Sequence, residues 1–185
     1  MSLAAAERHI EAFLEMMQAE RGAAANTLAA YRRDLDHAEG WSVRRGAILA
    51  EADTPLLRRY MQSLAKSGLA SGTAARRLAA LRQFFRFLFA EGVRSDDPAA
   101  ALDSPRRARP LPKILSEAEV EALLAAARRR DGAEGARLVA LMELLYATGL
   151  RVSELVSLRH SAAAGDPRFL VVRGKGNKER MVPIS

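Results

Sequence analysis

The stretch Phe169-Leu-Val-Val-Arg-Gly-Lys-Gly-Asn-Lys-Glu-Arg-Met-Val-Pro-Ile184 decides the fold class of the C-terminal part of the chain. Phe169–Val172 predicts a strand, the glycines on either side of Lys175 predict a turn, and Met181–Ile184 predicts a return strand. A two-stranded hairpin is only marginally stable and needs a third strand or a helix beside it. We therefore expect an α+β domain that is incomplete where this sequence stops.

Helices are expected immediately before the hairpin. Ser116-Glu117-Ala118-Glu119 has the spacing of a capping box and predicts the start of a helix. A second helix is predicted over about residues 134–147, and its leucine-rich end indicates that it is buried. Thr148-Gly149 ends this helix, and a short helix is predicted to follow, with Arg151 in its first turn.

The first 92 residues predict four amphipathic helices, because apolar side chains recur at helical spacing between breaks near Gly22, Pro55, Gly68 and Gly92. Asn26 is a candidate N-cap for the second of them. Four such helices in a short stretch form a compact bundle. The chain is thus predicted to be mainly α.

Proline and arginine dominate the segment that follows the bundle. Four prolines interrupt any helix there, and the positions from Pro105 to Lys113 carry cations but no acidic residue. Prolines favour an extended strap over a flexible one. We expect a helical domain over residues 1–94, a basic proline-rich linker over residues 95–113, and the N-terminal part of a second, truncated domain over residues 114–185.

Composition excludes several classes of protein. The 185 residues include no cysteine, 28% are charged and 49% are hydrophobic, which excludes a disulfide-stapled mini-protein, a cysteine-based zinc module and a disordered chain. The three histidines have no ligand spacing, so no metal site is expected. No secretory signal and no apolar run of roughly 18 residues is found, so we expect a cytoplasmic protein without a membrane partner.

The formal net charge of +7 indicates a polyanionic partner. Cations concentrate in residues 71–94, 105–113 and 168–180, an arrangement that suits a DNA duplex held between two lobes. An ordinary solvated arginine-rich face is the alternative. The candidate DNA contacts are Arg32, Arg33, Arg76, Arg77, Arg82 and Lys178.

Two cationic residues, Arg151 and Lys175, have positions in the sequence that indicate a role in binding an anion or in catalysis. Arg151 is electrostatically misplaced at the amino end of a helix unless it binds an anion there, the alternative being a salt bridge to Glu154 three residues later. Lys175, between two glycines, is expected at the hairpin tip, where its ammonium can enter a groove. Charge alone does not separate it from Lys178. The glycine spacing fits neither a Walker loop nor a dinucleotide loop.

With these motifs the sequence resembles the tyrosine recombinase (integrase) superfamily, most closely the XerD/XerC recombinases that resolve chromosome dimers. Two segments are highly specific together, Tyr146–Leu155 and Gly174–Arg180. Further matching segments are Asn26–Leu28, Tyr31–Leu35, Ala75–Leu78, Leu81-Arg82, Asp97-Pro98, Ser104-Pro105, Leu111–Lys113, Leu115–Val120 and Val182-Pro183.

The resemblance implies a four-helix core-binding (SAM-like) domain and the start of an integrase catalytic domain that clamp opposite sides of a duplex. Arg151 falls on the family's first catalytic arginine, which holds the scissile phosphate, and Lys175 on its hairpin lysine, suited to protonate the departing 5′ oxygen. The implied reaction proceeds through a 3′-phosphotyrosine without cofactor or metal. The implied partners are a double-stranded DNA recombination site, a paralogous or identical protomer in a tetrameric synapse, and a DNA translocase.

The family's nucleophilic tyrosine and its His-x-x-Arg motif lie beyond the hairpin. None of the three histidines here begins that motif, and Tyr31, Tyr60 and Tyr146 lie on apolar stripes that predict core packing. Without its nucleophile, covalent catalysis does not proceed. This chain is therefore expected to bind DNA without cutting it. A natural DNA-binding module without catalysis and a phage or mobile-element integrase are the alternatives.

Overall fold

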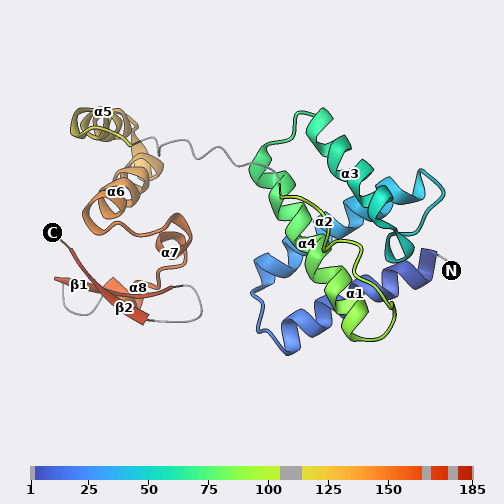
Figure 1. Ribbon diagram of the computed structural model, residues 1–185. Helices are drawn as coiled ribbons and strands as arrows, with labels where there is room; N and C mark the ends of the chain where they lie inside the picture. The colour runs from blue at the N-terminus through green and yellow to red at the C-terminus, as the bar shows by residue number, and fades with distance from the viewer. Residues whose placement is uncertain (1–2, 105–113, 164–167, 175–178, 185) are drawn as a thin grey trace. The chain divides into compact units, whose positions relative to one another are not determined.

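The structure, a computed structural model, describes residues 3–104, 114–163, 168–174 and 179–184 (Figure 1). The chain forms two compact units, Met1–Pro110 and Leu111–Ser185. Each unit has its own hydrophobic core. The two units are therefore described one at a time.

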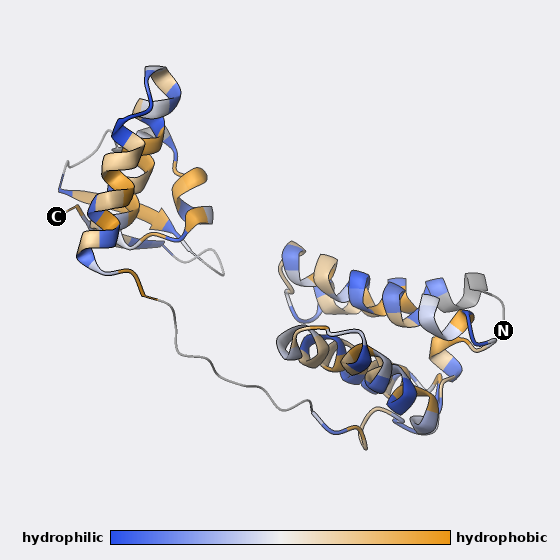
Figure 2. Cartoon of the chain, turned by 90° about the horizontal axis from the view of Figure 1, so that it is seen from above, coloured by the Kyte–Doolittle hydropathy of each residue, from blue (hydrophilic) through white to orange (hydrophobic). Residues whose placement is uncertain are grey.

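The first unit is the helical bundle that the sequence predicts. It consists of α1 (Leu3–Ala19), α2 (Ala25–Val43), α3 (Thr54–Lys66) and α4 (Ser71–Ala90), with a short 3₁₀ helix η1 (Leu49–Glu51) before α3. The α4 helix packs against the other three α-helices. These helices carry both hydrophilic and hydrophobic residues along their length, as amphipathic bundle helices do (Figure 2).

The helix starts follow local rules in one case and depart from them in another. The Asp53 carboxylate caps α3 by accepting the backbone N–H of Leu56 at 2.8 Å. The cap residue of α2 is Ala24, whose backbone is extended and whose side chain forms no capping hydrogen bond. Asn26, expected as the N-cap, therefore lies inside the helix.

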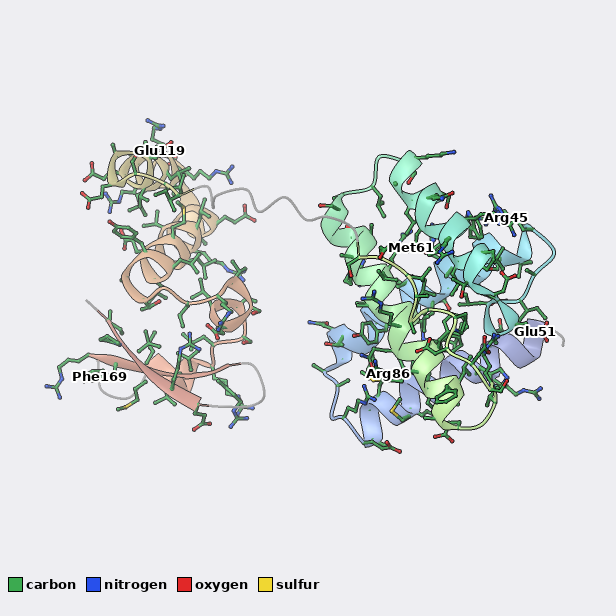
Figure 3. All side chains as sticks on the ribbon, in the orientation of Figure 1. Arg45, Glu51, Met61, Arg86, Glu119 and Phe169 are labelled. Atoms are coloured by element: carbon green, nitrogen blue, oxygen red, sulfur yellow. The ribbon has the colours of Figure 1, made fainter. Side chains whose placement is uncertain are left out.

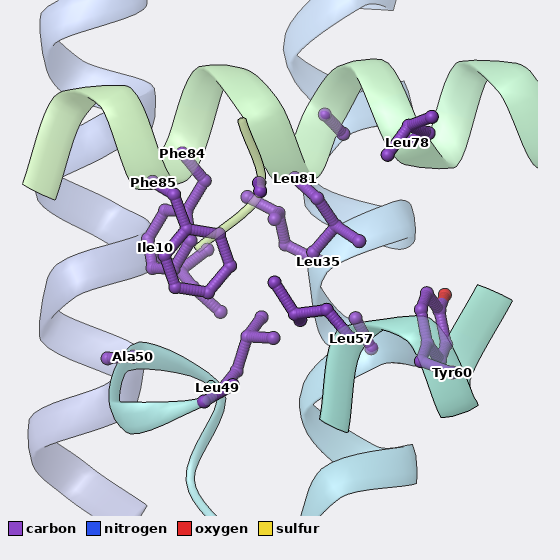
Figure 4. Close-up of a cluster of buried hydrophobic side chains, with 14 of the residues drawn as sticks. Ile10, Leu35, Leu49, Ala50, Leu57, Tyr60, Leu78, Leu81, Phe84 and Phe85 are labelled. Carbon is purple, nitrogen blue, oxygen red and sulfur yellow. The ribbon is translucent and has the colours of Figure 1, made fainter. Parts of the chain in front are cut away.

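The core of the first unit is aromatic and aliphatic (Figure 4). Phe13 and Phe84 are fully buried and meet edge to face, with ring centroids 5.8 Å apart. Trp41 and Tyr60 meet in the same way at 5.4 Å. Phe89, near the end of α4, is 52% exposed, unlike the buried Phe84 and Phe85. It shares a face of α4 with the exposed Arg86, three residues earlier, whereas the neighbouring Leu88 is fully buried.

The packed part of the first unit continues beyond residue 94, where the sequence placed the start of a linker. Ala99 and Leu102 are 0% and 4% exposed and belong to the bundle core. The Thr54 hydroxyl also donates a hydrogen bond to the Pro98 carbonyl at 2.9 Å. Residues 105–113, which hold the basic part of the expected linker, lie outside the described residues.

The second unit contains helices followed by a hairpin, as predicted. Its elements are α5 (Glu117–Arg128), α6 (Gly132–Thr148), α7 (Val152–Val156), α8 (His160–Ala163), β1 (Phe169–Arg173) and β2 (Glu179–Pro183). The capping box of α5 is present: the Glu119 carboxylate accepts the Ser116 N–H at 2.8 Å, and the Ser116 hydroxyl accepts the Glu119 N–H at 3.3 Å. The strands pair antiparallel, with Leu170 opposite Val182 and Val172 opposite Arg180.

The core of the second unit is small. Leu150, Leu155, Leu170, Val172 and Val182 form it, and leucines of α6 pack against it while only partly buried. The prediction that α6 is buried is therefore wrong for the described residues, in which this helix contacts α5 and α7. Tyr146 is 60% exposed, contrary to the predicted core packing. The described helices include none with the length and apolarity needed to cross a bilayer.

Candidate functional site

The turn between α6 and α7 places Arg151. Gly149 adopts a left-handed conformation (φ 62°, ψ 24°), which a residue with a side chain rarely adopts, and its N–H donates to the Leu145 carbonyl at 2.9 Å. The α6 helix ends there, as Thr148-Gly149 predicted. Arg151 has an extended backbone (φ −71°, ψ 149°) and stands at the N-cap of α7. It therefore lies one residue before the helix rather than in its first turn.

The Arg151 side chain is open to solvent and paired with its neighbour at the same time. Its Nη1 donates to Glu154 Oε1 at 2.9 Å, and its backbone N–H donates to Glu154 Oε2 at 2.9 Å. The salt bridge considered as an alternative from the sequence is thus present. The side chain nevertheless remains 69% exposed, so most of the guanidinium is available to an anion.

Glu154 receives a second arginine, from the hairpin. Arg180 Nη1 donates to Oε1 at 2.8 Å and Nη2 to Oε2 at 2.9 Å, the bidentate geometry that favours arginine–carboxylate pairs. The Glu154 side chain is 5% exposed. The Arg180 hydrogen bonds, followed by that of the Arg151 backbone, lower the pKa of Glu154 to about 2. The carboxylate is therefore ionised at every physiological pH.

Sequence reasoning missed Arg180 as a site residue, since it counted only as one more cation of a basic segment. Its contact joins positions 26 residues apart, and no local spacing encodes such a contact. Glu154 was visible through its i,i+3 spacing from Arg151. The structure shows that this carboxylate is the shared partner of two arginines, Arg151 and Arg180, and not of Arg151 alone.

Lys175 and Lys178 lie outside the described residues. Arg173 and Glu179, the last residue of β1 and the first of β2, pair through their side chains at 2.8 Å. A cavity of about 940 Å³ adjoins the hairpin, with Glu154, Arg159 and Arg173 among its lining residues. Its lining combines two arginines with two acidic residues, Glu154 and Glu179, and with apolar side chains of both strands. Of the three-residue cluster of Arg151, Glu154 and Arg180, only Glu154 lines the cavity.

In the first unit, two of the candidate DNA contacts lie on α2. Arg32 pairs with Glu11 of α1 at 2.5 Å and is 42% exposed. Arg33 is exposed, and its Nε donates to the Ala29 carbonyl at 3.1 Å. Each of these contacts uses only some of the five N–H donors of the guanidinium group. Both side chains therefore retain donors that face water.

Two further candidates, on α4, enclose a buried carboxylate. Asp34 is 2% exposed and pairs with Arg76, and Arg77 Nε lies 3.7 Å from its Oδ1. Burial raises the pKa of Asp34, and the two arginines oppose that rise. Arg76 remains 44% exposed, but Arg77 is only 15% exposed and also contacts the His37 ring. Arg77 is therefore much less open to DNA than Arg76, and its side chain compensates a buried charge.

Arg82 hydrogen-bonds to residues 102 and 104, in the segment that follows α4. Its Nη2 donates to the Leu102 carbonyl at 2.5 Å, and its Nη1 donates to the Ser104 hydroxyl at 3.1 Å. On the same helix, Arg86 is exposed (Figure 3). Arg82 thus has a structural partner that its place in a basic helix did not reveal.

Among the described residues no three His, Asp or Glu side chains gather as metal ligands would.

Comparison with known proteins identifies the architecture. The model for the phage integrase N-terminal SAM-like domain matches residues 10–92, and the phage integrase family model matches residues 113–185. The chain belongs to the phage integrase family. The tyrosine recombinase resemblance of its motifs and the fold class predicted from its sequence are confirmed.

Curated relatives of this integrase-family chain carry the name tyrosine recombinase XerD. The Rhizobium meliloti protein is 54% identical over 183 residues, which cover 96% of this chain and 59% of the relative. The Caulobacter vibrioides protein is 50% identical over 179 residues, covering 97% of this chain and 59% of the relative. The chain thus spans about three fifths of the length of these relatives.

Solved integrases share its fold. A lambda integrase (75–356) dimer bound to a COC′ core site matches with a TM-score of 0.75 at 23% identity, covering 99% of this chain and 62% of that one. A lambda integrase tetramer bound to a Holliday junction matches with a TM-score of 0.73 at 22% identity, covering 96% and 50%. At these identities the likeness concerns the fold.

Proposed function

We propose that this chain is the portion of a XerD-type site-specific recombinase that binds DNA and holds the scissile phosphate. The proposed recombinase cuts and rejoins DNA through a 3′-phosphotyrosine to resolve chromosome dimers. The observation that carries the proposal is the identity of 50% or more to XerD proteins over nearly the whole chain. The exposed, anchored guanidinium of Arg151 supplies a chemical reason for it.

Arg151 is proposed to hold the scissile phosphate. Phosphoryl transfer needs positioning and neutralisation of the charge on the equatorial oxygens more than covalent help from the protein. A guanidinium offers parallel donors that match two phosphate oxygens. Glu154 holds the Arg151 backbone N–H and one guanidinium nitrogen, Nη1, while 69% of the side chain stays exposed, which is the combination that such a role requires.

Lys175 is proposed to protonate the 5′ oxygen that leaves. A departing alkoxide needs a donor within hydrogen-bond reach, and an ammonium group can supply the proton. In the sequence, Lys175 stands between the last residue of β1 and the first residue of β2. Lys178 is proposed as a DNA contact beside it. Support for both roles comes from their places in the segment Gly174–Arg180.

The chain is proposed to bind DNA without cutting it. Tyr60 is 1% exposed, and burial raises the pKa of its hydroxyl to about 12, which makes it unfit as a nucleophile. Tyr31 stacks on Phe13, with ring centroids 6.1 Å apart. Tyr146 is exposed and supplies the test: incubation with a recombination site should leave no phosphotyrosyl-linked DNA. A linked product that disappears in Tyr146→Phe would overturn the proposal.

For the first unit we propose phosphate contacts from Arg32, Arg33, Arg76 and Arg82, whose guanidinium groups keep donors beyond their internal contacts. The proposed partners are a double-stranded recombination site in the cytoplasm, a second recombinase protomer in a tetrameric synapse, and a DNA translocase. Phosphate contacts of this kind position a protein on a duplex without specifying sequence.

The deciding experiment replaces Arg151 in a protein that continues through the length of its XerD relatives. Arg151→Ala should lower the cleavage rate by roughly 100-fold or more, as the loss of one transition-state donor does, with a much smaller change in DNA affinity. Arg128→Ala is the control, since Arg128 is 61% exposed and its ion pair with Glu143 joins α5 to α6. A large loss of affinity with unchanged cleavage would contradict the assigned role.

A further inference from the structure

We propose that Arg180 is a positioning residue that compensates the charge of Glu154 and thereby leaves the Arg151 guanidinium able to attract a phosphate. The inference rests on the proposed function, which gives Arg151 that phosphate. It concerns a residue that neither touches the reacting atoms nor belongs to the predicted site.

The hydrogen bonds around Glu154 are unequal. Arg180 occupies both carboxylate oxygens, at 2.8 and 2.9 Å, through two different nitrogens. The Arg151 side chain reaches only Oε1, through one nitrogen at 2.9 Å. Because a bidentate pair is stronger and more directional than a single charge-assisted bond, Arg180 is the main partner of the carboxylate.

The charge of the cluster follows from this arrangement. Two guanidinium groups and one carboxylate leave a net charge of one positive unit, and Arg151 is more exposed (69%) than Arg180 (40%). Without Arg180, the pair of Arg151 and Glu154 would be neutral, and the carboxylate would repel any phosphate that approached. Arg180 therefore determines whether Arg151 presents charge to a ligand.

The hairpin fixes Arg180 in this position. Side chains two residues apart share one face of a strand, so Arg180 lies on the same face as Val182, which is 8% exposed and part of the core. Val172, opposite Arg180 in the register, is 1% exposed. The intervening Met181 is 71% exposed on the other face. The core-facing side of β2 thus directs the guanidinium toward α7.

The test titrates the 185-residue chain with inorganic phosphate at constant ionic strength and follows the Nε–Hε NMR signal of Arg151, assigned by its loss in Arg151→Lys. Arg180→Gln should weaken the phosphate response of Arg151 by roughly fivefold or more, the effect of one unit charge a few ångströms away in water. Arg180→Lys, which keeps the charge but not the fork, should stay within about twofold of the unchanged chain.

A double variant separates charge from architecture. In Arg180→Gln/Glu154→Gln no carboxylate remains to be compensated, so the phosphate response of Arg151 should recover to at least its original strength. A purely structural role for Arg180 predicts no such recovery. Because this variant buries no unpaired charge, it also keeps the inference testable if Arg180→Gln alone does not fold. Arg128→Gln, which opens the exposed pair with Glu143, should change nothing.

The outcomes are distinct. An unchanged response in Arg180→Gln, or a double variant as weak as the single one, overturns the inference and leaves the role of Arg151 standing. If inorganic phosphate does not move the Arg151 signal of the unchanged chain at all, both the inference and the assignment of Arg151 fail. Loss with Arg180→Gln, retention with Arg180→Lys and recovery in the double variant together establish it.

Discussion

The Tyr60 hydroxyl and His37 Nδ1 lie 3.0 Å apart and join α3 to α2 inside the first unit. Arg77 Nη1 contacts the same imidazole nitrogen at 3.0 Å, so a phenol, a histidine and an arginine meet at one point. Burial, followed by the charges of Arg77 and Arg44, lowers the pKa of His37. The junction is therefore built around a neutral imidazole near pH 7.

Alkaline pH should destabilise the first unit through Tyr60. Burial raises the pKa of Tyr60 from 10 to about 12, so its stabilising contribution is complete below pH 10 and is lost as pH rises through 12. Two pKa units correspond to about 3 kcal/mol. The free energy of unfolding in urea should fall by up to that amount between pH 10 and 12, measured by the fluorescence of Trp41, the single tryptophan.

Tyr60→Phe is the matched control, because it keeps the ring that packs on Trp41 and removes the hydroxyl. Its unfolding free energy should be lower near neutral pH, by about 1 kcal/mol for the lost hydrogen bond. It should also lack the alkaline decline beyond the background shared by both proteins. An equally steep decline in Tyr60→Phe would show that another group is responsible.

Acid should act on the second unit through Glu154. The hydrogen bonds from Arg180 and Arg151 lower the pKa of this carboxyl from 4.5 to about 2, so its contribution to stability is present above pH 4.5 and is lost as pH falls through 2. Amide hydrogen exchange at Leu170 and Val172, in the core of the second unit, should report the loss.

Glu154→Gln removes the titrating group, and protection of Leu170 and Val172 should then depend less on pH over this range. The unfolding of the first unit, followed by Trp41, should be unaffected by the substitution. A pH profile of Leu170 and Val172 that Glu154→Gln leaves unchanged would assign the acid sensitivity to other carboxylates.

Local sequence rules determined much of the second unit. The Ser116–Glu119 capping box, the glycine at position 149 and the hairpin strands all depend on residues close together in sequence, and the structure contains each of them. Such features are predictable because their partners are within one turn of a helix or across a short loop. The roles of Arg151 and Lys175 remain predictions.

Features that depend on distant neighbours were not predictable. Tyr146 lies on an apolar stripe, yet no described helix covers it. Arg77 belongs to a basic helix, but the buried Asp34 of α2 determines its role. The same holds for Arg180, whose partner is set by the packing of β2 on α7. In each case the sequence shows the charge or polarity of the side chain. Its burial and its partner depend on tertiary contacts that the sequence does not show.

Arg32 and Arg77 should separate DNA binding from stability. Arg32→Gln removes one proposed phosphate contact, so the slope of log affinity for duplex DNA against log salt concentration should fall by roughly 1. Its effect on unfolding should stay below about 1 kcal/mol, because its pair with Glu11 is exposed. Salt-dependent fluorescence anisotropy with a labelled duplex provides the measurement.

Arg77→Gln should give the opposite result. It leaves the buried Asp34 with one arginine fewer, which should cost about 2 kcal/mol of stability in the first unit. The salt slope should remain that of the unchanged chain at temperatures where the bundle is folded. A reduced slope with unchanged stability would place Arg77 at the DNA after all.

Gly135 should tolerate no side chain. A Cβ built at this position on α6 would lie 1.9 Å from the Arg130 carbonyl oxygen and 2.6 Å from its carbonyl carbon, so the backbone before α6 would have to move. Gly135→Ala should therefore destabilise the second unit by about 1–3 kcal/mol, the usual cost of overpacking. Faster amide exchange at Leu170 and Val172, with unchanged unfolding of the first unit by Trp41 fluorescence, is the expected result.

Gly40→Ala is the matched control, also within a helix. There the nearest atom to an added Cβ is Arg44 Nη1 at 3.6 Å, an ordinary contact with the end of a long side chain. Alanine should raise the stability of the first unit by about 0.5–1 kcal/mol, because it restricts the unfolded chain and favours the helix. If Gly135→Ala also stabilised its unit, the close approach of the Arg130 carbonyl could not be a feature of the folded protein. The turn before α6, the helix whose other end leads to Arg151, would then have a different geometry.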